Sequence, residues 1–267
     1  MIRPSRRSVL AGIGYITTIS PSSEDDLKPT PKMRSMAASS DQRAISGSLP
    51  SGRLTRSPAN PIINNTESYE SNRASCRAIA VVGANDYRMW YEALDNDQTD
   101  RIAYATSTDG ITWTKHGIVM VPSQAWENSE TSPDSVLYED GVFKMWYHGG
   151  AGWIRGVFRP AESIGLATSP DGITWTKYAG NPILSSGASG TWDSGHVTGG
   201  PVFNLSAMGL GDGYRMYYNG EPPTPADRRG LGMATSPDGV TWTKYSSNPV
   251  IPYGFGANSD YEDGREP

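Results

Sequence analysis

The stretch "ATSPDGITWTKY", residues 167–178, decides the fold of this chain because the chain contains it three times with small changes. The other copies are "ATSTDGITWTKH", from Ala105, and "ATSPDGVTWTKY", from Ala234. An aromatic pattern precedes each copy: "YRMWY" from Tyr87, "FKMWY" from Phe143 and "YRMYY" from Tyr214. Repetition of whole units, rather than of one short motif, indicates a repeat architecture.

The second unit shows what one repeat is expected to form. Alternating side chains and turn residues predict four strands, at residues 135–138, 142–147, 163–168 and 174–178. The turn "EDG" joins the first strand to the second, "SPDG" joins the third to the fourth, and a long loop joins the second to the third. Four antiparallel strands per unit predict an all-β fold, a β-propeller in which each repeat is one blade.

The repeated phrase has the chemistry of a tight turn. Pro170 presets φ, Asp171 accepts backbone hydrogen bonds, and Gly172 takes the left-handed conformation that a bulged hairpin requires. An indole supplies a large apolar area between stacked sheets, so the tryptophans of the phrase are expected to pack on the neighbouring blade. These residues are Trp113, Trp175 and Trp242.

The aspartates of the three phrases, Asp109, Asp171 and Asp238, could instead mark a calcium loop or a catalytic acid. In an antiparallel blade, the start of the first strand and the end of the second lie on one face, and the tight turns lie on the other. Propellers usually bind ligands on the first of these faces, so we expect the three aspartates to be structural.

Composition excludes several classes of protein. A net charge of −5 argues against nucleic-acid binding, which needs a basic patch. With Cys76 as its single cysteine, the chain forms no internal disulfide and no thiolate metal cage. It contains no apolar run of about 18 residues, so no membrane-spanning helix is expected.

The N-terminal part differs from the repeats. Arg6 and Arg7 precede a mildly apolar segment, so residues 1–20 resemble a twin-arginine export signal and predict an extracytoplasmic protein. An organellar transit peptide or an unstructured tail is the alternative. Residues 21–57 are rich in Ser, Pro, Arg and Lys and read as a disordered linker. Residues 58–267 form the predicted propeller domain, with blades at about 70–121, 130–184 and 197–251.

The repeats resemble those of the five-bladed propeller superfamily of arabinanases, levansucrases and invertases, notably glycoside hydrolase families 43 and 32. The resemblance rests on "SVLYEDGVFKMWYHGG", "IGLATSPDGITWTKYAGNPIL" and "TWDSGHVTGGPVF", and covers about residues 58–252. It implies a central funnel with three carboxylates near the starts of the first strands: a base or nucleophile, a pKa-modulating Asp and a Glu acid. The chain departs from that pattern, because Ser132 and the pair Gly199–Gly200 stand where acids are expected.

Glycoside cleavage needs two carboxyl groups held apart, one protonated and one ionised. On the expected face, Asp134 is the predicted base, and Glu130 or Glu221 the predicted acid. Glu92, at the end of its strand, is a further candidate. The predicted substrate-binding residues are His148, His196, Asp193, Trp153 and Arg73. For the charged and histidine residues, a role as a solvated rim residue is the alternative. For Trp153 the alternative is a loop aromatic that covers a blade edge.

The blade count leaves three complete blades, which do not close a ring of this kind. The chain is then a piece of a longer one, or another chain supplies the missing blades, or the fold departs from a normal propeller. Self-association of two half-rings is one such arrangement.

Three functions remain open. The first is an exported glycoside hydrolase that acts on polysaccharide or oligosaccharide by acid/base catalysis, without a cofactor apart from an optional structural calcium. The second is a non-catalytic carbohydrate-binding propeller. The third is a biosynthetic cyclase or isomerase that reuses the funnel. Fold likeness alone does not decide among them.

Overall fold

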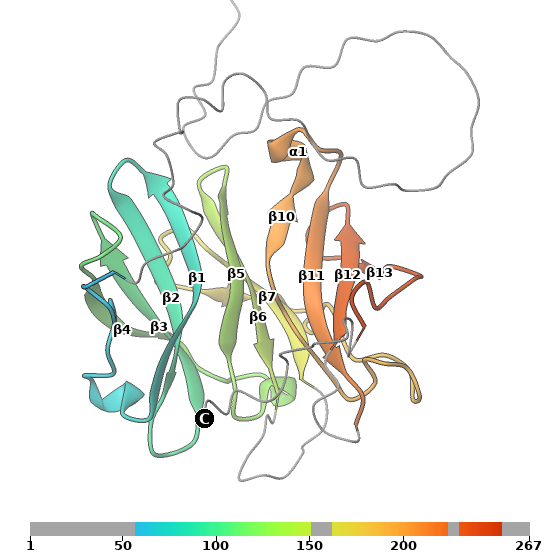
Figure 1. Cartoon of the computed structure of the whole chain (residues 1–267), viewed down its shortest axis with the longest axis horizontal. Helices are drawn as coiled ribbons and strands as arrows, with labels where there is room; N and C mark the ends of the chain where they lie inside the picture. The colour runs from blue at the N-terminus through green and yellow to red at the C-terminus, as the bar shows by residue number, and fades with distance from the viewer. Residues whose placement is uncertain (1–56, 151–161, 224–229, 253–267) are drawn as a thin grey trace, which may run out of the picture. The chain divides into compact units, whose positions relative to one another are not determined.

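The computed structural model describes residues 57–150, 162–223 and 230–252, and within them it contains three antiparallel sheets (Figure 1). Each sheet is built on four strands that are neighbours in chain order, with β9 added to the third sheet. The all-β propeller with four-stranded blades is therefore confirmed. The predicted signal, residues 1–20, lies outside the described residues, as does nearly all of the predicted linker.

The strands of the three blades have the following bounds. The first blade contains β1 (Arg73–Gly83), β2 (Asp86–Leu94), β3 (Asp100–Ser107) and β4 (Thr114–Met120). The second contains β5 (Ser132–Glu139), β6 (Val142–Gly149), β7 (Ser163–Ser169) and β8 (Thr176–Lys177). The third contains β9 (His196–Thr198), β10 (Val202–Asn204), β11 (Tyr214–Glu221), β12 (Gly230–Ser236) and β13 (Thr243–Lys244). Short helices precede the first two blades and follow β10: Ser68–Glu70, Ala125–Glu127 and α1 (Leu205–Met208).

The turn of the repeated phrase forms as its sequence predicts. Gly172 has φ +82°, and Oδ1 of Asp171 accepts the backbone N–H groups of Ile173 and Thr174, both at 2.8 Å. These hydrogen bonds lower the pKa of Asp171 to about 2. Asp109 and Asp238 accept the equivalent bonds in their own turns, so the structural role of the three aspartates is confirmed.

The last strand of the second blade is shorter than expected. The sequence predicts a strand over residues 174–178, but β8 contains only Thr176 and Lys177. The N–H of Thr174 is bound to the Asp171 side chain and is not available to the strand ladder. The first strand of the third blade is also interrupted, because Gly199 and Gly200 separate β9 from β10.

Two of the three repeated tryptophans join neighbouring blades. Trp175 of the second blade contacts Trp90 of the first blade in an edge-to-face arrangement, with 5.8 Å between ring centroids. The Trp90 indole N–H donates a hydrogen bond of 2.8 Å to the Gly172 carbonyl. Trp242 meets Trp146 in the same way across the next interface. Trp113 differs from the prediction, because it packs with Met89, Tyr91 and other residues of its own blade and of the segment before it.

Buried acids tie each blade to the segment that precedes it. Glu127 accepts from Lys177 Nζ at 2.6 Å and from the Tyr147 hydroxyl at 2.7 Å. Asp193 accepts from Lys244 at 2.6 Å and from Tyr218 at 3.2 Å in the third blade. Glu70 pairs with Lys115 in the first. This pairing of a buried acid with a lysine, which we call the blade clasp, thus recurs with each repeat, and a tyrosine also donates to the acid in the second and third blades.

Candidate functional site

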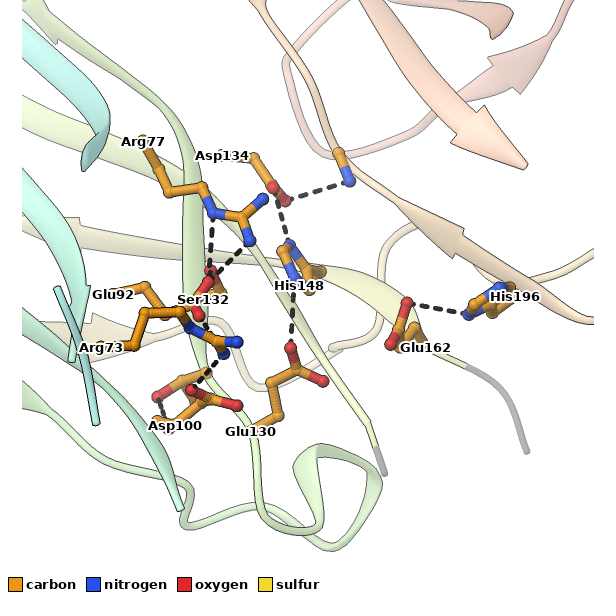
Figure 2. A network of polar contacts seen from close by, with 12 residues as sticks. Arg73, Arg77, Glu92, Asp100, Glu130, Ser132, Asp134, His148, Glu162 and His196 are labelled. Carbon is orange, nitrogen blue, oxygen red and sulfur yellow. Dashed lines mark hydrogen bonds and ion pairs between the residues drawn. The ribbon is translucent and has the colours of Figure 1, made fainter. Parts of the chain in front are cut away.

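Charged side chains gather where β1, β5 and β9 begin and where β2, β6 and β11 end (Figure 2). In antiparallel sheets these strand ends lie on the same side of the blades, opposite the tight turns, and we call this side the site edge. The residues that face one another there are Arg73, Arg77, Glu92, Asp100, Glu130, Ser132, Asp134, His148, Glu162 and His196.

Glu92 is the most enclosed of these acids, with no exposed surface. Arg77 Nη2 lies 2.7 Å from its Oε2, the Ser132 hydroxyl donates to the same oxygen at 2.8 Å, and Arg73 pairs with Oε1. Burial acts to raise the pKa of Glu92, but Arg77 and Arg73 together hold it below its ordinary value. Glu92 is therefore an ionised anchor for two arginines, not a proton donor.

Asp100 lies on the other side of Arg73, with 2.9 Å between Arg73 Nη2 and its Oδ1. Burial raises the pKa of Asp100 to about 7, with Glu92 and Glu130 adding to the effect and Arg73 opposing it. A carboxyl group that changes charge near neutral pH thus lies beside the predicted acid, Glu130.

His148 lies between two carboxyl groups. Its Nδ1 is 2.7 Å from Asp134 Oδ1, and its Nε2 is 3.4 Å from Glu130 Oε1. Burial acts to lower the pKa of His148, but Asp134 and Glu130 raise it well above its ordinary value. The imidazole is therefore charged at neutral pH. Among the described residues, no group hydrogen-bonds Oε2 of Glu130, although that atom is buried.

Gly199 explains one departure from the expected carboxylates. Its backbone N–H donates to Asp134 Oδ2 at 3.1 Å, and a Cβ at this position would lie 2.2 Å from the same oxygen. No side chain fits there. The position where the resemblance implies an acid is filled by the carboxylate of Asp134, which reaches across from the second blade.

A second imidazole has the same surroundings. His196 Nδ1 is 2.9 Å from Glu162 Oε2, and its Nε2 is 2.9 Å from Glu221 Oε2. Burial acts to lower the pKa of His196, but the two glutamates raise it to about 9. The site therefore contains two imidazoles, each placed between two carboxylates.

The predicted site residues fall into separate groups. Asp134, Glu130, His148 and Arg73 belong to the first cluster, and Glu221 and His196 belong to the second. Asp193 is placed in the blade clasp of the third blade, where its partners are Lys244 and Tyr218. Trp153 lies outside the described residues.

Three contributors were not predicted: Arg77, Asp100 and Glu162. Asp100 and Glu162 stand at or just before the starts of β3 and β7, on the same edge as the residues that were predicted. The position of these strands in the blade is the signal that could have identified them.

Two further properties concern metals and membranes. Among the described residues, no group of three or more His, Cys, Asp or Glu side chains is arranged to hold a metal ion. Within residues 57–150, 162–223 and 230–252, no helix is long and apolar enough to cross a membrane.

Two known sequences are similar to part of this chain. No family model matches the chain. Uncharacterized protein Rv1502 of Mycobacterium tuberculosis (strain ATCC 25618 / H37Rv) is 30% identical over 138 residues, which cover 48% of this chain and 43% of that protein. A protein of a second strain of the same organism matches equally. The chain thus matches less than half of the length of these relatives.

Solved structures share the fold. The family 117 glycoside hydrolase Zg3597 of Zobellia galactanivorans has a TM-score of 0.58 and 17% identity, covering 73% of this chain and 61% of that one. A second glycoside hydrolase structure has a TM-score of 0.56 and 22% identity, covering 72% of this chain and 61% of that one.

A phosphorylase has the same fold as well. The β-1,2-mannobiose phosphorylase of Listeria innocua has a TM-score of 0.51 and 19% identity, covering 69% of this chain and 47% of that one. This chain spans less than two thirds of each of the three structures. Its propeller is therefore of the kind found in glycoside hydrolases and phosphorylases.

Proposed function

We propose that this protein is a glycoside hydrolase-like enzyme that cleaves oligosaccharide or polysaccharide by carboxylate acid/base catalysis. The proposal includes export, which the twin-arginine-like residues Arg6 and Arg7 support. Fractionation of cells that express the full chain, with and without replacement of both arginines by lysine, tests export. Retention of the unaltered chain inside the cell would contradict it.

The observation that carries the enzymatic proposal is the arrangement of Asp134, His148 and Glu130. The two carboxyl groups contact opposite nitrogens of one imidazole, at 2.7 and 3.4 Å. With the width of the ring, their contacting oxygens lie at most about 8 Å apart, which is below the upper limit of roughly 9.5 Å for the separation of acid and base in glycosidases.

The surroundings suit different roles for the two groups. Asp134 accepts from the Gly199 N–H at 3.1 Å and lies 2.7 Å from His148 Nδ1, so two donors fix the carboxylate that we assign as the base. Glu130 Oε2 is buried and has no hydrogen-bond partner among the described residues, and we assign this carboxyl group as the acid. Glu221 is the alternative acid, although it contacts a different imidazole from the one that Asp134 contacts.

Hydrolysis of a panel of aryl glycosides and oligosaccharides by the purified chain tests these roles. We expect Asp134→Asn and Glu130→Gln each to reduce kcat by at least about 100-fold. Glu221→Gln separates the two candidates for the acid. Asp212→Asn, at an exposed carboxyl group, is the matched control and should leave kcat unchanged. Turnover that survives both Asp134→Asn and Glu130→Gln would overturn the assignment.

A non-catalytic carbohydrate-binding propeller is the second candidate. The observation that favours it is the enclosure of the charged cluster, since the side chains of Asp134 and His148 are only 2% and 3% exposed. Under this alternative, a folded and soluble chain binds sugars on an affinity gel but shows no turnover on any member of the panel.

A further inference from the structure

The two interfaces between blades follow one pattern. In each interface, a tryptophan on the second strand of one blade packs on the repeated turn of the next blade. We call the face of a blade that carries this tryptophan its back face, and the opposite face its front face. Trp90 and Trp146 are both fully buried, and their indole N–H groups donate to the carbonyls of Gly172 and Gly239 at 2.8 and 2.9 Å. A back face that is covered by another blade therefore has a buried aromatic ring in contact with a glycine turn.

The back face of the third blade is not covered in this way. Tyr217 is the counterpart of Trp90 and Trp146 in "YRMYY", and it is partly exposed. Phe203 on the neighbouring strand is 37% exposed, and the two rings contact each other with 6.3 Å between centroids. Two aromatic side chains therefore remain available at the position where the preceding blades meet a partner.

The front face of the first blade is open as well. Ile79, Val136 and Val202 pair with the methionine of the aromatic pattern in their blades, so they occupy equivalent places. Val136 is 7% exposed and Val202 is 3% exposed, but Ile79 is 46% exposed. Val81, two residues along the strand, is 64% exposed.

The glycine in the turn of the first blade, Gly110, has different surroundings from its counterparts in the other two blades. A Cβ on Gly172 would lie 2.9 Å from Trp90, and one on Gly239 would lie 3.1 Å from Trp146. The three atoms nearest to a Cβ on Gly110 all belong to Tyr87, a residue of its own blade, at 3.7–3.9 Å. Gly110 nevertheless has the same left-handed conformation as the other two, with φ +72°.

We propose that these two faces bind each other between two copies of this chain. The back face of the third blade in one copy, with Phe203 and Tyr217, packs on the front face of the first blade in the other, with Ile79, Val81 and the Gly110 turn. The contact repeats the pattern of the two internal interfaces, in which one side supplies the ring and the other the glycine turn. Both faces expose large apolar side chains in one copy, and such surfaces mark interaction sites.

The test is the mass of the full chain in solution, measured by light scattering over a range of concentrations. We expect an assembly of at least twice the chain mass. Ile79→Lys and Phe203→Glu alter opposite sides of the contact, and each should shift the mass to that of a monomer while circular dichroism is unchanged. Ile173→Lys is the matched control, because Ile173 is 49% exposed in a turn that already contacts its neighbouring blade.

Amide exchange provides a readout that does not depend on the variants. Exchange of the unaltered chain at β1 and β11 should slow as concentration rises, while exchange at β6 stays constant. A monomer at every concentration overturns the proposal. Concentration-independent protection of both faces overturns it too, because it would assign the cover to the same chain. If the mass of the assembly is unchanged by both substitutions, the contact lies elsewhere on the protein, and the proposal is overturned.

Discussion

Nδ1 of His148 lies 2.7 Å from Oδ1 of Asp134, and the two side chains are only 3% and 2% exposed. Each charge is therefore stabilised chiefly by the other, with Glu130 and the Gly199 N–H as further partners. A buried ion pair of this kind is costly to break, because removal of one partner leaves the other charge enclosed and uncompensated.

The first prediction concerns this pair. His148→Ala should lower the free energy of unfolding by about 3–5 kcal/mol, because Asp134 would remain buried without its cation. The double variant with Asp134→Asn should recover part of this loss, since no charge is then left enclosed. Urea unfolding of both single variants and of the double variant gives the coupling free energy. Strict additivity of the two losses would contradict the pairing.

The second prediction concerns His196. Its pKa rises from 6.5 to about 9 on folding, so the stabilisation is fully present below about pH 6.5 and is lost as the pH rises through 9. The loss is on the order of 3 kcal/mol. We expect His196→Gln to flatten the fall in the free energy of unfolding between pH 6 and pH 9.5. The exposed His116, replaced by Gln, is the control. An unchanged slope in His196→Gln would show that the pair with Glu162 and Glu221 does not stabilise the fold.

The third prediction concerns Asp100. Burial, with Glu92 and Glu130, raises its pKa from 3.8 to about 7, so the ionised form is disfavoured in the folded protein. Stability should therefore fall as the pH rises from about 4 through 7, by on the order of 4 kcal/mol. Asp100→Asn keeps an acceptor for Arg73 but carries no charge, and it should be more stable than the unaltered chain at pH 8. If the free energy of unfolding of Asp100→Asn falls between pH 4 and pH 8 by as much as that of the unaltered chain, Asp100 is not the titrating group.

Local chemistry made the blades predictable from sequence. The turn depends on residues that are adjacent in the chain, Asp171 and Gly172 among them, so three copies of one phrase report it directly. The blade clasp depends on residues about 50 apart, such as Glu127 and Lys177. Its acidic partner follows an aromatic residue in "YE", "WE" and "WD", and pairs this short do not stand out as a repeat.

The site was predictable only in part, for a similar reason. The blade topology placed Asp134, Glu130 and His148 on one edge, but it could not show that a single imidazole separates the two acids. Glu162 precedes β7 in a loop that has no counterpart of similar sequence in the other blades. Asp193 lies near His196 in the sequence, but its carboxylate contacts Lys244, which is 51 residues away in the chain.

The last prediction concerns Gly199. A methyl group at this position would lie 2.2 Å from Oδ2 and 2.7 Å from Cβ of Asp134, so either the backbone or the carboxylate must shift. We expect Gly199→Ala to cost about 1–3 kcal/mol of stability, in the range of overpacked interior sites. It should also reduce any turnover by displacing Asp134 from His148. Gly83→Ala is the matched control, since the nearest atom to a methyl group there is 4.0 Å away. Thermal unfolding and turnover of both variants decide the matter, and equal behaviour of the two would show that the close contact at Gly199 does not hold Asp134 in place.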